Sequence, residues 1–96
     1  MFLVMAILTF RHKGLKQLFL TGKSSKVAPK LQANALMILD VLEGMHDRRD
    51  LVGVQDFHPL TGNRKGTYAM HVNGNYCITF CIQGADVSDV NLEDYH

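Results

Sequence analysis

Hydrophobic residues in the first half of the chain recur at helical spacing, after a short apolar segment. The apolar segment predicts a buried strand over residues 7–10, and residues 1–5 could be a disordered leader. A first helix is expected over residues 12–21, and Gly22 ends it. A second helix can begin at Pro29, a residue favoured in the first turn, and ends at Gly44. Its apolar stripe consists of Leu31, Ala35, Ile38, Leu39 and Leu42.

The second half of the chain alternates apolar and polar residues, which indicates strands with one buried face. Two neighbouring antiparallel strands are predicted at residues 68–72 and 76–82, and a last strand at residues 87–92. A three-residue loop between the first two strands puts their apolar side chains on one face, whereas a two-residue turn would mix the faces. The predicted pairs are then Val72–Tyr76, Met70–Ile78 and Tyr68–Phe80 on the apolar face, with His71–Cys77 and Ala69–Thr79 on the other.

These elements predict an α+β fold, because helices that are segregated from an antiparallel meander form a layer on one side of the sheet. We expect both helices to cover the apolar face, and the face with His71 and Cys77 to stay open and hold a site. With 47% hydrophobic and 20% charged residues, the 96-residue chain fits a single domain over residues 1–96. That composition argues against a disordered tail and a coiled coil.

Charge and cysteine content add two expectations. The net charge is only +1, but residues 11–30 contain six basic residues and no acid. This asymmetry predicts a basic face for nucleic acid or an acidic partner, although a solvated helix face explains it equally well. Two cysteines are too few for a disulfide scaffold, so we expect a reducing, cytoplasmic location. The apolar start is too short to span a membrane, which takes about 20 residues.

Standard cofactor and metal motifs are not found in the sequence, so we expect no metal and no cofactor. His58 and His96 are instead candidates for proton transfer. Pro59 favours an extended backbone at His58, and Asp94 together with the terminal carboxylate favours the charged form of His96. A surface loop and a frayed tail are the alternative interpretation of these two histidines.

Two histidines, a tyrosine, a carboxylate and a basic turn fit the cleavage of RNA through its own 2′-hydroxyl. Such a reaction needs a proton acceptor, a proton donor for the leaving 5′-oxygen, and positive charge on the phosphorane. It requires neither a protein nucleophile nor a metal ion.

Short segments from about residue 8 to residue 96 resemble the HigB toxins of the RelE-like superfamily, also called plasmid maintenance killer proteins. The segments are FRHKGLK at 10–16, FHPL at 57–60, GNRKG at 62–66, VNGN at 72–75, ITF at 78–80 and EDYH at 93–96. The resemblance implies the RelE-like α+β fold and a toxin that enters the ribosomal A site and cuts mRNA during translation. It also implies a HigA-like helix-turn-helix antitoxin, through which alone operator DNA would be bound, and no membrane contact.

The same resemblance suggests roles for individual residues. The histidine of the His-Pro-Leu segment and the Asp-Tyr-His end are implicated in catalysis in this family, and these roles would fall on His58, Asp94, Tyr95 and His96. Phosphate would be held by Arg64 and Lys65. Basic residues of the first helix, such as Arg11, Lys13 and Lys16, could contact ribosomal RNA or form a plain solvated face.

Two positions depart from the family pattern. Thr61 follows His-Pro-Leu where a lysine is usual, and Cys77 stands where an arginine is usual in the next-to-last strand. Loss of one such cation costs on the order of 2.7–4 kcal/mol of transition-state stabilisation, unless Arg64, Lys65 or His71 compensates. Two alternatives therefore stay open: a weakened or inactive homologue that binds the antitoxin and acts as a co-repressor, and redox control through Cys77.

Overall fold

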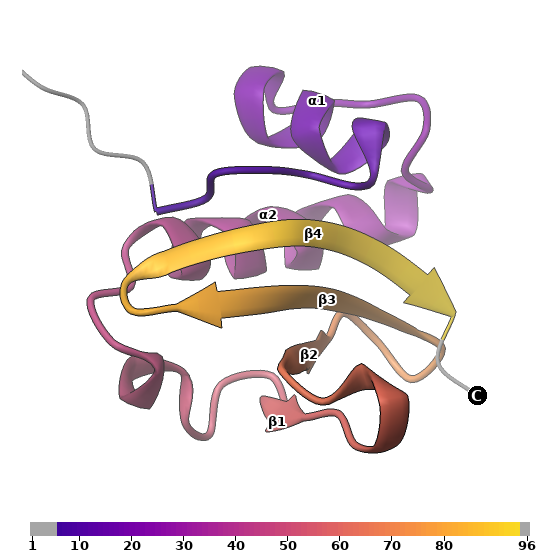
Figure 1. The fold of residues 1–96 in the computed structure, drawn as a ribbon. Helices are drawn as coiled ribbons and strands as arrows, with labels where there is room; N and C mark the ends of the chain where they lie inside the picture. The colour runs from indigo at the N-terminus through magenta and orange to yellow at the C-terminus, as the bar shows by residue number, and fades with distance from the viewer. Residues whose placement is uncertain (1–5, 95–96) are drawn as a thin grey trace, which may run out of the picture.

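The computed structural model describes residues 6–94, which form two α-helices, two 3-10 turns and one four-stranded antiparallel sheet. In chain order the elements are α1 (Lys13–Thr21), α2 (Pro29–Glu43), η1 (Arg48–Leu51), β1 (His58–Pro59), η2 (Gly62–Arg64), β2 (Thr67–His71), β3 (Tyr76–Gln83) and β4 (Asp86–Asp94). The strands lie in the order β1-β2-β3-β4. Figure 1 shows α2 behind β3 and β4, with α1 beside it. The predicted α+β fold is therefore confirmed.

Both helices end where predicted and α2 begins at Pro29 as predicted, whereas α1 begins one residue later than predicted. Nδ1 of His12 accepts the N–H of Leu15 at 3.0 Å, so His12 caps α1 and precedes its first turn. Gly22 ends α1 with a φ of +82°, a conformation that a residue with a Cβ rarely adopts. The missing N–H of Pro29 costs nothing in the first turn of α2, and Gly44 follows the last residue of that helix.

The β2–β3 pair has the predicted register. Partners across the two strands include Tyr68–Phe80, Ala69–Thr79, Met70–Ile78 and His71–Cys77. The N–H of Val72 donates to the carbonyl of Tyr76 at 2.9 Å, which closes the three-residue loop. Within that loop, Oδ1 of Asn73 accepts the N–H groups of Asn75 and Tyr76 at 2.8 and 2.9 Å. The asparagine side chain thus satisfies two backbone donors that would otherwise need water.

The hydrophobic core fills the space between α2 and the apolar face of the sheet. Every residue of the predicted stripe on α2 is at most 2% exposed. The sheet contributes Met70, Ile78 and Phe80, which are fully buried, and Val87 and Val90 of β4 belong to the same cluster. The face that the alternating pattern predicted as buried is therefore covered by α2, with α1 beside α2, which leaves the opposite face for a site.

The N-terminal segment differs from the prediction of a buried strand over residues 7–10. It runs parallel to β4 and pairs with it through isolated bridges of Ile7 to Val87 and of Phe10 to Val90. Leu8 is 58% exposed, so only part of the segment is buried. The ladder is interrupted at Asp89, where β4 has a φ of +55° and the N–H bonds Oγ1 of Thr9 at 2.8 Å. The predicted leader, residues 1–5, lies outside the described residues.

No helix within residues 6–94 has the length and apolarity that crossing a membrane would require.

Candidate functional site

The face of the sheet opposite α2 carries two rows of paired side chains. One row runs from His58 on β1 through Ala69 and Thr79 to Asn91 on β4, and the next consists of His71, Cys77 and Glu93. Paired residues of neighbouring strands place their side chains on the same face of a sheet. The middle of this face is nevertheless covered, because Thr79 is only 3% and Cys77 only 4% exposed.

An ion pair covers that middle region. Arg64 ends η2, and its guanidinium makes two hydrogen bonds with the carboxylate of Glu93, at 2.8 and 2.7 Å. The hydroxyl of Thr79 donates to the same carboxylate. The hydrogen bonds from Arg64, and then the one from Thr79, lower the pKa of Glu93 from 4.5 to about 2. The predicted phosphate ligand is therefore paired with an acid that sequence analysis did not single out.

Cys77 lies directly across from Glu93 on the neighbouring strand. Burial raises the pKa of its thiol, the charge of Glu93 raises it further, and Arg64 opposes the effect. Thiolate chemistry needs a lowered pKa, so this environment is the opposite of what redox control through Cys77 requires. Cys77 is a buried free cysteine.

His58 and His71 lie side by side at the β1–β2 edge, with ring centroids 5.7 Å apart. Nδ1 of His58 donates to the backbone carbonyl of Asp56 at 2.7 Å. Nε2 of His71 lies 3.4 Å from Oδ2 of Asp56. Gln55 and Asp56 both have positive φ values, +48° and +56°, which are uncommon for residues other than glycine. This turn brings Asp56 next to His71.

Asp94 does not share this site. It ends β4 and lines a pocket of about 390 Å³ together with His12, Lys26 and Tyr76. His58 and Asp94 belong to strands at opposite edges of the sheet, three spacings apart, or roughly 14 Å. Residues 6–94 therefore do not bring the predicted catalytic residues together, and Tyr95 and His96 lie outside the described residues.

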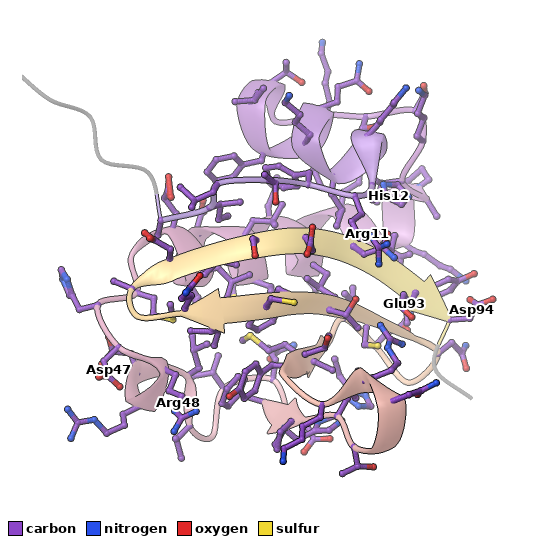
Figure 2. All side chains as sticks on the ribbon, viewed as in Figure 1. Arg11, His12, Asp47, Arg48, Glu93 and Asp94 are labelled. Carbon is purple, nitrogen blue, oxygen red and sulfur yellow. The ribbon has the colours of Figure 1, made fainter. Side chains whose placement is uncertain are left out.

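The predicted basic residues Arg11, Lys13, Lys16, Arg64 and Lys65 are all exposed. The prediction that Arg11 belongs to the first helix is wrong. Since His12 caps α1, Arg11 lies in the preceding segment, and its N–H donates to the carbonyl of Val90 at 2.8 Å. Its side chain lines a pocket of about 280 Å³ with Arg64 and Thr79. Figure 2 shows Arg11 near Glu93, toward the C-terminal end of β4.

Comparison with known proteins adds a family to this geometry. Residues 8–96 match the family model of the HigB-like toxin, described as a RelE-like toxin of the type II toxin-antitoxin system HigB. The chain belongs to the HigB-like toxin family. Endoribonuclease HigB of Proteus vulgaris is 36% identical to it over 95 residues, which cover 94% of this chain and 99% of that protein. The resemblance inferred from the short segments is thereby confirmed, and a toxin of this type has an antitoxin as its partner.

Two acids at the site of this HigB-like toxin escaped the sequence analysis. Glu93 is 29 positions from Arg64, and Asp56 is 15 positions from His71. No local spacing connects such residues, because the sheet register and the loops bring them together. For Glu93 a signal existed, since it alternates with Leu92 and so falls on the polar face once β3 and β4 are paired.

Proposed function

We propose that this HigB-like toxin is an endoribonuclease that cleaves mRNA in a ribosome-dependent manner and so inhibits translation. The match to the family over residues 8–96 carries this proposal, because it spans every residue assigned to the candidate site. The name of the Proteus vulgaris relative supports the same reaction. The expected partner is a HigA-like helix-turn-helix antitoxin, through which operator DNA would be contacted, and the expected location is the cytoplasm.

The proposed mechanism is metal-independent and uses the 2′-hydroxyl of the RNA as the nucleophile. His58 and His96 transfer the two protons, and Asp94 and Tyr95, the two residues before His96 in the chain, orient or assist His96. The hydrogen bond from Nδ1–H of His58 to the carbonyl of Asp56 puts the lone pair of the neutral ring on Nε2. This tautomer suits His58 as the proton acceptor, which assigns the protonation of the 5′-oxygen to His96.

Positive charge for the phosphate would come from Arg64, Lys65 and Arg11. The charge of Arg64 opposes the rise in the pKa of Cys77, the position where the family usually has an arginine, so Arg64 lies close to that position. Its pairing with Glu93 uses two of the guanidinium hydrogen-bond donors, and the remaining donors can bind phosphate oxygens. This supports Arg64 as the replacement for the missing arginine. Lys13 and Lys16 on α1 would contact ribosomal RNA through its phosphates.

The test is mRNA integrity in a purified translation system, with and without ribosomes. We expect cuts only in translated message, and a loss of cutting in His58→Gln and in a chain lacking His96. Arg64→Gln should slow cutting on the order of a hundredfold. A chelator selective for transition metals, which leaves Mg²⁺ in place, should not stop cutting. Intact message with a folded wild-type sample would refute the proposal and favour a homologue that only binds its antitoxin and represses.

A further inference from the structure

Three metal-ligating side chains meet at the β1–β2 edge of the polar face. One ligand atom from each of Asp56, His58 and His71 lies within 4.8 Å of the other two. We propose that this cluster binds a divalent transition-metal ion of the zinc class, and that the bound ion inhibits the toxin by occupying His58. The binding site stands on the geometry alone, whereas the inhibition rests on the proposed function.

The separations fit a small tetrahedral site. Bond lengths of about 2.0–2.2 Å from zinc to nitrogen and oxygen put neighbouring ligand atoms about 3.3–3.5 Å apart. Nε2 of His71 and Oδ2 of Asp56 are already 3.4 Å apart. The other separations, taken between one ligand atom of each residue, are at most 4.8 Å and must shorten by at most about 1.5 Å. The side chain of Asp56 is 75% exposed and has room for that movement.

The backbone holds two of the three ligands in position. His71 bonds Gln55 through both of its own main-chain groups. Its N–H donates to the main-chain carbonyl of Gln55 at 2.7 Å, and its carbonyl accepts from the side-chain amide Nε2 of Gln55 at 2.9 Å. The positive φ values of Gln55 and Asp56 are costly for residues with a side chain, and such conformations cluster at functional sites.

The ligand set favours zinc or a related transition metal over Mg²⁺ or Ca²⁺, since those ions prefer oxygen ligands. In protein sites, a histidine bound to a metal usually donates its other ring N–H to a carbonyl or carboxylate. His58 already donates from Nδ1 to the carbonyl of Asp56, so its Nε2 would be the coordinating atom. Two imidazoles and one carboxylate leave a fourth tetrahedral position for water.

Coordination would remove the chemistry proposed for His58. The lone pair on Nε2 cannot accept the 2′-hydroxyl proton while it binds a metal ion. The ion is therefore an inhibitor of the cleavage reaction and not a participant in it. Asp56 has no assigned part in cleavage through its side chain, and its main-chain carbonyl is unaffected by substitution with asparagine.

Binding is tested first, with Co²⁺ as a visible probe and Zn²⁺ as the competitor, on the full chain after treatment with a chelator. We expect Co²⁺ to give the absorption of a tetrahedral site and Zn²⁺ to displace it. Asp56→Asn and His71→Gln each remove a direct ligand, so each should weaken binding by more than the roughly tenfold to hundredfold that loss of an outer-shell partner costs. His46→Gln is the matched control, since His46 is exposed and outside the cluster. Equal binding by wild type and both cluster variants would overturn the metal site.

Inhibition is tested by adding Zn²⁺ to the translation assay. Cleavage by wild type should fall on the order of a hundredfold at saturating Zn²⁺, because one acid–base group is lost. Asp56→Asn and His71→Gln, each compared with its own metal-free rate, should keep that rate when Zn²⁺ is added. Zn²⁺ that binds without slowing wild type would overturn the inhibitory role. A metal-free wild type that never cleaves would refute the proposed function, and the inhibitory role with it, while the Co²⁺ measurement still decides the metal site.

Discussion

Replacing Glu93 with glutamine removes one negative charge from the polar face and keeps the shape of the side chain. The glutamine carbonyl can still accept a hydrogen bond, but the charge-assisted pair with Arg64 is lost. We expect Glu93→Gln to destabilise the fold at neutral pH and to have little effect at low pH.

The magnitude follows from the pKa of Glu93, which is lowered from 4.5 to about 2. Converted at about 1.4 kcal/mol per pKa unit, this shift sets an upper limit of roughly 3.5 kcal/mol on the stabilisation at neutral pH. The side chain of Arg64 is 43% exposed, so solvent screens the pair. We therefore expect Glu93→Gln to lower the free energy of unfolding by about 1–2 kcal/mol. Asp86→Asn, at the exposed start of β4, should change it by less than about 0.5 kcal/mol.

The pH dependence has a definite sign. The pKa of Glu93 is lower in the folded protein than the usual 4.5. The stabilisation that ionised Glu93 gives the fold is therefore complete above pH 4.5 and is lost as the pH falls toward about 2. Urea denaturation at about pH 7 and about pH 3 should show the difference between wild type and Glu93→Gln shrinking by more than half. A difference that is absent at neutral pH, or equal at both pH values, would refute the reasoning.

Three further predictions concern stability and are measured by thermal or urea denaturation. A Cβ at Gly14 would lie 2.7 Å from two side-chain carbons. Gly14→Ala should therefore lower the free energy of unfolding by about 1–3 kcal/mol, despite the better helix propensity of alanine. A variant more stable than wild type would contradict this packing. Gly22→Ala should lower the free energy of unfolding by about 1 kcal/mol, because Gly22 has a φ of +82°. Gly44 has a φ of −86°, so Gly44→Ala should leave the free energy of unfolding unchanged or raise it. Equal losses of stability in the two variants would argue against this backbone difference. Leu51→Ala should lower the free energy of unfolding by about 2–5 kcal/mol, because Leu51 is fully buried. Val52 is 72% exposed, so Val52→Ala should lower it by less than about 0.5 kcal/mol. The reverse order of the two losses would show that η1 packs differently.

The fold could be predicted from the sequence where a local pattern has a single physical solution. The loop between β2 and β3 is such a case, because a three-residue loop keeps Met70 and Ile78 on the same face, whereas a two-residue turn would not. The N-terminal segment is the counter-example. Its apolar composition indicates burial, but its pairing depends on the irregular backbone of β4 at Asp89. The sequence of residues 7–10 contains no sign of that irregularity.

The site could be predicted only in part, because its charges are arranged across strands. In the sequence, Cys77 stands where the family usually has an arginine, so a positive charge is missing at this position. In the structure, Cys77 lies opposite Glu93 in the register of β3 and β4. An arginine at position 77 would lie opposite that carboxylate and could pair with it directly. With cysteine there, Glu93 takes its cation from η2, and Arg64 is drawn over the same part of the face. The structure therefore places a cation from another element over the part of the face where this chain lacks the family's usual arginine.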